Sequence, residues 1–530
     1  MVEVNNLTMR FSSKVLFEDI NLKLDRGKRY GLIGANGAGK STFLKILAGE
    51  IEPTSGNVSI ENGLKVGVLS QNQYAFEDFT LRDAVLYGNK RLYDAIKEKE
   101  KLYESGDFED DKVNERLSEL EIICAEEDPT YEVDVNIEKI LSSLGFAPET
   151  YDNLVSSLKG GERFKILLAQ VLFPKPDVLF LDEPTNNLDL EAISWLEEQL
   201  KRHEGTMVVI SHDRHFLNAV VTHILDVDFK KIREFSGNYD DWYIASTLIQ
   251  KQQELERAKK LREKEELEAF VRRFSANASK AKQATSRQKR LEKLNLEDLQ
   301  TSSRREPSIV FKRKRDIGNE ILEVVEIEKS YDKKVLDKIS FKVEKGEKIA
   351  LIGSNGVGKT TLLKIIMDEL KQDSGEVKWG ATIEPSYFPQ NTTEIITEDM
   401  ELFEWLKMYD PKNDLDDIRK CLGRMLFSGE EQKKKAKDLS GGEKHRLMLS
   451  KMMLQRGNFL ALDEPDNHLD LEAIVALGEA LYRFDGNVLC VTHDRELIDA
   501  FANRIIELKA DGSYIDFKGN YEKFVETYKQ

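Results

Sequence analysis

The feature that most constrains this chain is an internal repeat built around two glycine-rich loops. The sequence Gly34-Ala-Asn-Gly-Ala-Gly39-Lys40-Ser41 returns 319 residues later as Gly353-Ser-Asn-Gly-Val-Gly358-Lys359-Thr360. Each loop follows a short apolar run and precedes an amphipathic stretch, which is the strand, loop, helix order of a phosphate-binding turn. Two such loops in register argue against a chance match and predict two copies of one domain.

The rest of each copy repeats as well, but with a different spacing. Gln71 and Gln390 keep the offset of 319, whereas Gly161 and Gly442, Asp182-Glu183 and Asp463-Glu464, and His212 and His493 are all 281 residues apart. The difference, 319 − 281 = 38, places an insertion of 38 residues in the first copy, between its glutamine and its paired glycines.

Apolar runs and amphipathic stretches alternate through both copies, which predicts α/β domains with largely parallel sheets. Val178–Leu181 and Phe459–Leu462 are expected buried strands that end on Asp-Glu. The chain of 530 residues is long enough for several domains. We predict a first domain over 1–243 with an inserted arm at about 88–135, a linker over 244–318, and a second domain over 319–530.

The segment between the copies has a composition of its own. Residues 238–306 contain no Gly or Pro in 69 positions, which favours helix throughout. A break near Ser275–Ser279 would divide the segment into two helices of about 30 residues, each about 45 Å long. Residues 270–315 carry 14 Lys and Arg against 4 Asp and Glu. The sequence therefore predicts a helical hairpin with a basic tip.

The insertion in the first copy has the opposite charge. Residues 90–135 contain 16 acidic and 7 basic side chains, and a periodic set of apolar residues suggests a second helical pair: Leu92, Ile96, Leu102, Leu117 and Leu120. Two interpretations remain open for this arm. Its acidic face is either simply solvated or contacts a basic protein surface.

The overall composition limits where the chain can work. The net charge is −17, no apolar run reaches the length of a membrane span, and the N-terminus lacks the pattern of a secretory signal. Cys124, Cys421 and Cys490 lack the spacing of a zinc site or a disulfide framework, as expected of free thiols in a reducing cytoplasm. We expect a cytoplasmic protein with no membrane partner.

The two loops carry the clearest chemistry. Their glycines let backbone N–H groups surround phosphates, Lys40 and Lys359 reach the β- and γ-oxygens of ATP, and Ser41 and Thr360 offer a hydroxyl to Mg²⁺. The nucleotide contacts expected from the loops are Gly34, Asn36, Gly37, Gly39, Lys40, Ser41 and Thr42 in the first copy, and Gly353, Asn355, Gly356, Gly358, Lys359, Thr360 and Thr361 in the second.

The strand ends supply the remaining groups for hydrolysis. Asp182 and Asp463 are expected to hold Mg²⁺, and Glu183 and Glu464 to polarise an attacking water. Gln71 and Gln390 are further expected Mg²⁺ ligands, or else surface amides. The sequence thus predicts an ATPase with Glu183 and Glu464 as catalytic residues.

His212 and His493 follow apolar runs, in Ile-Ser-His-Asp-Arg and Val-Thr-His-Asp-Arg. A single histidine in such a place is more often a structural cap. Because the pair recurs at a fixed distance from both glutamates, we predict catalytic histidines that contact the γ-phosphate.

Two further motifs carry a family resemblance. Leu158-Lys159-Gly160-Gly161-Glu162 and Leu439-Ser440-Gly441-Gly442-Glu443 resemble the signature of ATP-binding cassette proteins, and Leu188-Asp189 and Leu469-Asp470 resemble their D-loops. Two cassettes with a basic helical linker are similar to the ABC-F family of translation factors over essentially the full length. The run Arg273–Arg287 is most similar to the YbiT-like branch.

The resemblance implies a monomer in which two cassettes pair head to tail around two ATP molecules. Site one would combine the first copy's ATP and Mg²⁺ groups with Ser440, Gly441 and Gly442. Site two would combine the second copy's groups with Lys159, Gly160 and Gly161. Phe11 and Tyr331 would stack on adenine, unless they are core residues.

The resemblance also implies a partner. An ABC-F protein would bind the ribosome in the E site, with its arm near the L1 stalk and its linker against rRNA and the P-site tRNA. The nucleic-acid contacts would be Arg272, Arg273, Lys280, Lys282, Arg287, Lys289 and Arg290. The alternatives are the ATPase subunit of a membrane transporter, an antibiotic-resistance factor that protects ribosomes, and a DNA-repair or structural ATPase.

Two positions depart from the family pattern. Lys159 stands where the signature normally has Ser, and Asp466 stands where the first copy has Thr185. Both belong to site two, so the two sites are not expected to be equivalent.

Overall fold

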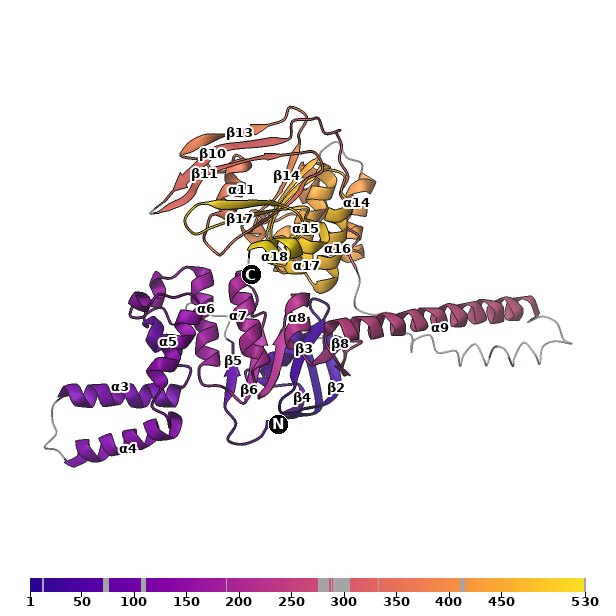
Figure 1. The fold of residues 1–530 in the computed structure, drawn as a ribbon. Coiled ribbons are helices and arrows are strands. Elements are labelled where there is room, and N and C mark those ends of the chain that lie inside the picture. The colour runs from indigo at the N-terminus through magenta and orange to yellow at the C-terminus, as the bar shows by residue number, and fades with distance from the viewer. Residues whose placement is uncertain are drawn as a thin grey trace.

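The chain folds into two stacked α/β cassettes from which two helical extensions project, as a computed structural model shows (Figure 1). The structure describes residues 1–528 with the exception of 12–13, 70–75, 106–110, 187, 275–285, 287, 289–305, 332 and 410–414. Gln71 and five basic residues of the linker lie outside the described residues: Lys280, Lys282, Arg287, Lys289 and Arg290.

The core of cassette one is a six-stranded sheet in the order β5-β6-β7-β3-β8-β9. Its strands are β3 (Arg29–Gly34), β5 (Val66–Val68), β6 (Val178–Asp182), β7 (Thr206–Ile210), β8 (His223–Asp228) and β9 (Lys231–Ser236). All pairs are parallel except β8 and β9. Because β6 and β7 are buried along their whole length, they read as continuous apolar runs, as parallel strands do.

Cassette two repeats this sheet in the order β14-β15-β16-β12-β17-β18. Its strands are β12 (Lys348–Ile352), β14 (Pro385–Phe388), β15 (Phe459–Asp463), β16 (Asn487–Val491), β17 (Arg504–Leu508) and β18 (Tyr514–Lys518). Only β17 and β18 pair antiparallel. The two nucleotide-binding domains predicted from the repeat are confirmed.

A three-stranded antiparallel sheet covers each cassette's phosphate-binding helix. In cassette one β1 (Val2–Phe11) lies between β2 (Lys14–Leu24) and β4 (Ser55–Ile60), and in cassette two β10 (Leu322–Ser330) lies between β11 (Lys334–Val343) and β13 (Ser374–Trp379). Apolar side chains of these sheets pack on α1 (Lys40–Leu47) and α11 (Lys359–Ile366).

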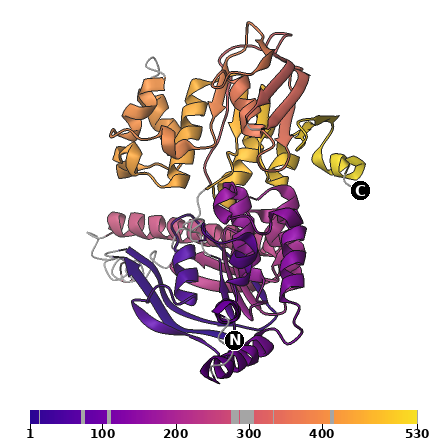
Figure 2. The same cartoon turned by 90° about the vertical axis from the view of Figure 1, so that its left-hand side faces the viewer.

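The remaining helices form the layer that faces the other cassette. Cassette one contributes α2 (Leu81–Leu86), α5 (Val133–Ser143), α6 (Gly160–Leu172), α7 (Leu190–Lys201) and α8 (Arg214–Val220). Cassette two contributes α12 (Thr392–Ile395), α13 (Leu402–Tyr409), α14 (Leu415–Arg424), α15 (Gly441–Gln455), α16 (Leu471–Arg483), α17 (Arg495–Phe501) and α18 (Tyr521–Tyr528). Figure 2 shows cassette two stacked on cassette one through these helices.

The insertion of cassette one forms an antiparallel pair of helices, α3 (Lys90–Ser105) and α4 (Asp111–Glu127). Many of their charged side chains pair across the two helices, as in Arg116 with Glu98 and Lys99 with Glu121. Leu92, Leu120 and Cys124 are buried, and they join the helices to a small apolar core.

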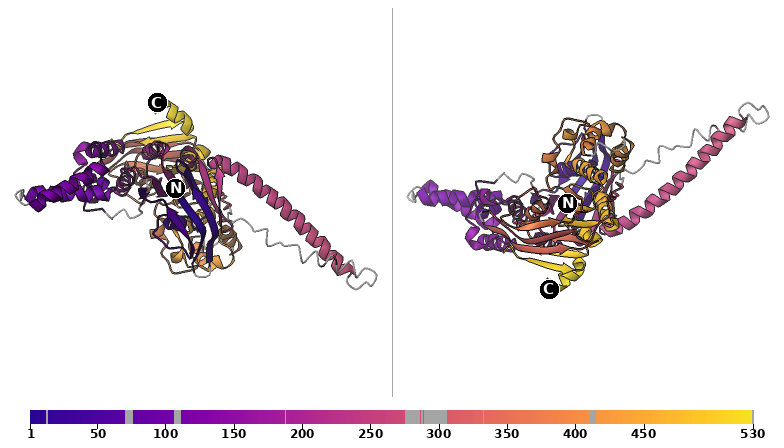
Figure 3. Two further views of the ribbon diagram at one scale, coloured as in Figure 1. Left: turned by 90° about the horizontal axis from the view of Figure 1, so that it is seen from below. Right: turned by 90° about the horizontal axis from the view of Figure 1, so that it is seen from above.

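The linker begins with one long helix, α9 (Tyr239–Phe274), of 36 residues. At 1.5 Å per residue it is about 54 Å long. It begins before the expected boundary at 244 and is longer than the predicted helix of about 30 residues, because Tyr239 and Trp242 are already buried in the core of cassette one. Figure 3 shows that α9 and the arm extend from opposite sides of the molecule.

Beyond the linker, the described chain resumes as an extended strap over 306–317 that lies on cassette two. Ile309, Phe311 and Ile317 are buried, whereas Lys312, Lys314 and Arg315 are exposed or nearly so. The strap is fixed by backbone hydrogen bonds from Ser308 to Arg424 and from Lys314 to Arg456. Four consecutive basic residues are thereby held on one surface.

Within the described part of the chain, every helix is too short or too polar to cross a membrane.

The seating of α9 gives a first prediction. Trp242 is 4% exposed, and its indole N–H donates to Asp226 at 3.2 Å. Trp242→Ala should destabilise cassette one by about 3–5 kcal/mol, since a large aromatic side chain leaves a cavity. Trp242→Phe should cost less, about 1–2 kcal/mol, because it mainly removes the hydrogen bond. Urea unfolding measures both, and an Ala variant as stable as the parent would show that α9 is not anchored here.

Candidate ATP sites

Both phosphate-binding loops close around the ammonium group of their lysine. Lys40 Nζ donates to the carbonyl of Gly34 at 2.8 Å, and Lys359 Nζ donates to the carbonyls of Gly353 and Ser354 at 2.8 and 3.0 Å. Gly39 and Gly358 adopt φ of 100° and 104°, which a side chain disfavours. Burial lowers the pKa of Lys359 to about 8. The loops therefore hold a buried cation at the start of α1 and α11, where phosphates bind.

Each loop hydroxyl meets the aspartate that ends the neighbouring strand. Thr360 Oγ1 donates to Asp463 Oδ1 at 3.2 Å, and Ser41 hydrogen-bonds Asp182. Burial, then the charge of Glu464, raises the pKa of Asp463 to about 7, and its Oδ2 is buried without a partner among the described residues. A hydroxyl beside a buried, incompletely bonded carboxylate fits the oxygen ligand set of Mg²⁺.

In cassette one the expected water-polarising group is paired with the expected γ-phosphate contact. His212 Nε2 lies 3.2 Å from Glu183 Oε1, and the His212 backbone N–H donates to Glu183 Oε2, also at 3.2 Å. Burial raises the pKa of Glu183 to about 7 and lowers the pKa of His212 well below its ordinary value. A carboxylate with this pKa can accept a proton from water near neutral pH.

In cassette two the same residues take different partners. Glu464 Oε2 accepts from Gln390 Nε2 at 2.9 Å and from Asn467 Nδ2 at 2.8 Å. Both ring nitrogens of His493 are buried without a hydrogen-bond partner among the described residues, and burial lowers the His493 pKa to about 3. The two sites, related by the repeat, thus differ in how they hold the glutamate.

The sheet explains why these groups meet. Asp182 pairs with Ile210 across β6 and β7, so Glu183 and His212 follow neighbouring strand ends, and Asp463 pairs with Val491 in the same way. Glu183 and Glu464 have φ of 51° and 49°, a left-handed conformation that is costly for glutamate. Their N–H groups donate to Ile210 and Val491, which fixes this turn.

The two P-loops also reach the opposite cassette. Asn355 N–H donates to Asp189 Oδ2 of cassette one at 3.4 Å, and Asn36 Nδ2 donates to the carbonyl of His468 of cassette two at 3.4 Å. Gly442 of the second signature lies beside Asn36. The cassettes therefore face each other head to tail, each P-loop toward the other's signature and D-loop.

The two signatures begin their helices differently. Ser440 caps α15 reciprocally with Glu443, whose carboxylate accepts from the Ser440 hydroxyl and backbone N–H at 2.8 and 2.9 Å. Lys159 occupies the same place before α6 with an exposed side chain, and only its backbone N–H donates to Glu162, at 3.1 Å. At the expected adenine positions, Phe11 and Tyr331 are 51% and 59% exposed, so they are not core residues.

Comparison with known protein families decides the assignment. A family model described as ABC transporter matches residues 17–186 and 336–467, and a second model with that description matches 225–311. YkpA of Bacillus subtilis, an ABC transporter ATP-binding protein, is 49% identical over 530 residues, covering 99% of this chain and 98% of that protein. The probable ATP-binding protein YbiT of Escherichia coli O157:H7 is 43% identical over 529 residues, or 99% of both chains.

Two more distant relatives carry more informative names. ABC transporter F family member 5 of Arabidopsis thaliana is 35% identical over 99% of this chain and 77% of its own length. The energy-dependent translational throttle protein EttA of Escherichia coli K12 is 34% identical over 97% of this chain and 93% of its own. The chain belongs to the ABC-F family. Its similarity to YbiT and YkpA places it in the YbiT-like branch.

Solved structures agree on the fold of this ABC-F protein. The archaeal ribosome recycling factor aABCE1, crystallised with the ribosomal stalk protein aP1, aligns with a TM-score of 0.62 at 18% identity, covering 98% of this chain and 92% of that one. The ABC-F protein is therefore an ATPase with two ATP-binding cassettes.

The ABC-F site includes residues that sequence reasoning did not single out. Asp189, Asn467 and His468 contact the P-loop or the glutamate, and Arg214 and Arg495 cross between the cassettes. The repeat carried a signal for the arginines, because both copies contain His-Asp-Arg. His468 carried none, since its counterpart in the first copy is asparagine.

Hydrolysis by the ABC-F protein can be tested at the two glutamates. Replacing Glu183 and Glu464 together by Gln keeps their size but removes the negative charge that polarises water. ATP should still bind, while turnover should fall by about 10²-fold or more. Phosphate release and ATP retention measure the two effects, and near-normal turnover by the double variant would contradict the assigned role.

Lys159 provides a second test. A charge near the γ-phosphate of site two should hold the ground state as firmly as the transition state, which raises affinity without raising the rate. We therefore expect site two to be slower, so that Glu183→Gln removes more turnover than Glu464→Gln. Lys159→Ser should speed turnover and weaken ATP retention. Kinetics identical to the parent would mean that the exposed lysine stays in solvent.

Proposed function

We propose that this ABC-F protein is a cytoplasmic translation factor that binds the ribosome in the E site and modulates translation by hydrolysing ATP. Its linker would approach rRNA and the P-site tRNA, and its arm the L1 stalk. The observation that carries the proposal is a basic linker projecting from a pair of ABC-F cassettes that are 34% identical to a translational throttle protein.

In this proposal ATP closes the cassettes around two Mg²⁺-bound nucleotides. Ser41 and Asp182 in one site, and Thr360 and Asp463 in the other, would hold the metal, with Gln71 and Gln390 as further ligands. Mg²⁺ would neutralise phosphate charge, while Glu183 and Glu464 orient water and His212 and His493 contact the γ-phosphate. The signature residues Lys159–Gly161 and Ser440–Gly442 would complete the opposite sites.

The distribution of charge supports an RNA partner for the linker end of the molecule. Arg272, in the last turn of α9, is exposed, and the sequence adds Arg273, Lys280, Lys282, Arg287, Lys289 and Arg290 beyond it. The strap places Lys312, Lys314 and Arg315 on cassette two. A chain with a net charge of −17 thus concentrates positive charge where RNA would bind.

The arm fits a different kind of contact. Its acidic surface would repel bare RNA, so a basic ribosomal protein is the better partner. This assigns the two extensions to two chemically distinct surfaces of one ribosome.

The proposal is tested by ribosome binding of the Glu183→Gln, Glu464→Gln double variant, which should co-sediment with ribosomes in ATP and slow translation in a cell-free system. Sedimentation without ribosomes would contradict the proposed function. Binding only in the presence of an antibiotic would favour a ribosome-protection role.

Salt dependence tests the linker separately. Phosphate contacts should make the logarithm of affinity fall with the logarithm of salt by up to about 0.9 per phosphate neutralised. Changing Lys280, Lys282, Arg287, Lys289 and Arg290 to Glu should weaken binding and reduce this slope by up to about 4. Intrinsic ATPase activity should persist.

A matched control carries the same charge change away from the linker, at the exposed residues Lys23, Lys342, Lys345, Lys371 and Lys378. This control should keep most of the slope. Equal losses in both variants would mean that total charge, rather than the linker, determines binding.

A further inference from the structure

The two His-Asp-Arg motifs begin equivalent helices in the two cassettes. Arg214 is the first residue of α8 and Arg495 the first residue of α17, and the preceding Asp213 and Asp494 cap these helices by accepting backbone N–H bonds at 2.9 and 2.8 Å. The local structure is thus the same, and both arginines point toward the interface between the cassettes.

Arg495 uses this position to hold the cassettes together. Its Nη2 donates to Ser194 Oγ at 2.6 Å and to the carbonyl of Leu190 at 3.4 Å, and its Nη1 lies 4.0 Å from Glu197. These residues belong to α7, the helix that Asp189 begins. The histidine loop of site two is therefore tied to the D-loop that contacts the P-loop of the same site.

Arg214 makes a different set of contacts. Its Nε and Nη2 donate to Asp240 Oδ1 at 3.0 and 2.6 Å, and its Nη1 lies 3.3 Å from Glu496 of cassette two. Its guanidinium carbon lies 5.5 and 5.7 Å from the rings of Tyr239 and Tyr243. Asp240 and both tyrosines are in the first turns of α9. Arg214 therefore joins the histidine loop of site one, the linker and cassette two.

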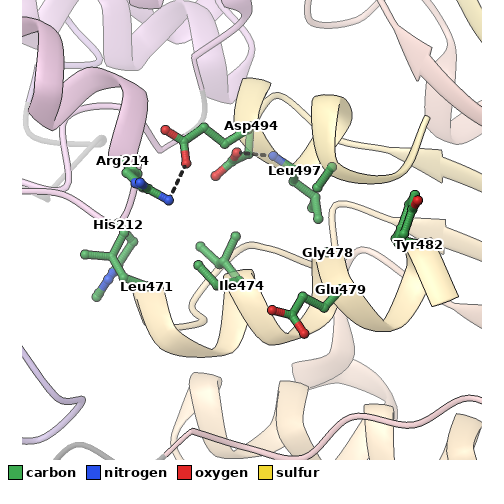
Figure 4. Close-up of a pocket in the computed structure, with 12 residues that line it drawn as sticks. His212, Arg214, Leu471, Ile474, Gly478, Glu479, Tyr482, Asp494 and Leu497 are labelled. Atoms are coloured by element: carbon green, nitrogen blue, oxygen red, sulfur yellow. Dashed lines mark hydrogen bonds and ion pairs between the residues drawn. The ribbon is translucent and has the colours of Figure 1, made fainter. Parts of the chain in front are cut away.

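The difference follows from two substitutions on α16. The positions equivalent to Ser194 and Glu197 are Val475 and Gly478, 281 residues later. They offer no side-chain acceptor to Arg214, and instead help to line an apolar cavity of about 350 Å³ together with Leu471, Ile474, Leu497 and Ala500 (Figure 4). Figure 4 shows the Arg214 side chain at the edge of this cavity, directed to the Glu496 carboxylate.

The base of α9 is suited to transmit a movement of Arg214. Tyr239 and Trp242 are buried in the core of cassette one, whereas the helix beyond them projects from the molecule. A small rotation at the base displaces the far end of a helix of about 54 Å by a much larger distance. The salt bridge to Asp240 acts on the first turn, where that rotation would originate.

We propose that Arg214 is a positioning residue that couples the linker to ATP turnover at site one, and that site two has no such connection. A ligand that moves the linker changes the Arg214–Asp240 contact, and through it the placement of His212, two residues earlier. At site two the equivalent arginine is bonded to α7, so the state of the linker does not reach His493 by this route. The inference rests on the proposed function, because it takes the ribosome as the ligand of the linker.

The test isolates each site. Glu464→Gln leaves hydrolysis to site one, and Glu183→Gln leaves it to site two. Ribosomes should change turnover at site one by about fivefold or more, the lower range of allosteric coupling, and by less than about twofold once Arg214→Ala or Asp240→Ala is added. Combining Arg214→Ala with Asp240→Ala should add nothing further. Turnover at site two should respond to ribosomes equally with and without these changes.

Arg495→Ala is the matched control, since it removes the equivalent arginine. It should leave the ribosome response of site one intact. The proposal is overturned if site one keeps its full response after Arg214→Ala, or if Arg495→Ala abolishes that response to the same extent.

A second measurement does not depend on ribosomes. Spin labels at the exposed positions Glu265 on α9 and Lys371 on cassette two, after Cys421→Ser, report the position of the linker. Adding Mg²⁺ and ATP to the Glu183→Gln, Glu464→Gln protein should shift the distance distribution, and Arg214→Ala should remove most of the shift. An equal shift in both proteins overturns the coupling, whereas a shift without any ribosome response contradicts only the proposed function.

Discussion

The structure depends on the reciprocal packing of the two cassettes across one interface. Leu190, at the start of α7, packs with the core of cassette two, and Leu471, at the start of α16, packs with the core of cassette one. These leucines directly follow the D-loop aspartates Asp189 and Asp470, both of which cap their helices. Apolar exchange thus fixes the D-loops against the opposite cassette, and with them the components of two composite sites.

Exact symmetry is lost where side chains, rather than backbone, make the contact. The two sheets, P-loops and left-handed glutamate turns superpose in their hydrogen bonding, because the backbone requires them. Glu183 nevertheless pairs with His212 while Glu464 pairs with Gln390 and Asn467, and Arg214 turns to the linker while Arg495 crosses to α7. One site is thereby connected to the linker and the other to the opposite cassette.

The two extensions divide the surface by charge. The arm is acidic and its helices are held by ion pairs such as Arg116 with Glu98, whereas the linker and strap are basic. They leave the molecule on opposite sides (Figure 3). Since both extensions belong to or begin at cassette one, any rearrangement of that cassette moves two chemically different surfaces at once.

The sequence by itself determined the repeat, the α/β cassettes, the P-loops, the inserted arm and a helical linker, because each leaves a local pattern of glycine, apolar periodicity or missing helix breakers. It also indicated that Lys159 makes the sites unequal. It could not show which residues meet across the interface. The contacts of Asn355 with Asp189, and of Arg214 with Asp240 and Glu496, join positions that no periodicity links. The tertiary structure alone decided them, since the direction of an arginine depends on acceptors that the opposite helix offers, and Val475 and Gly478 offer none.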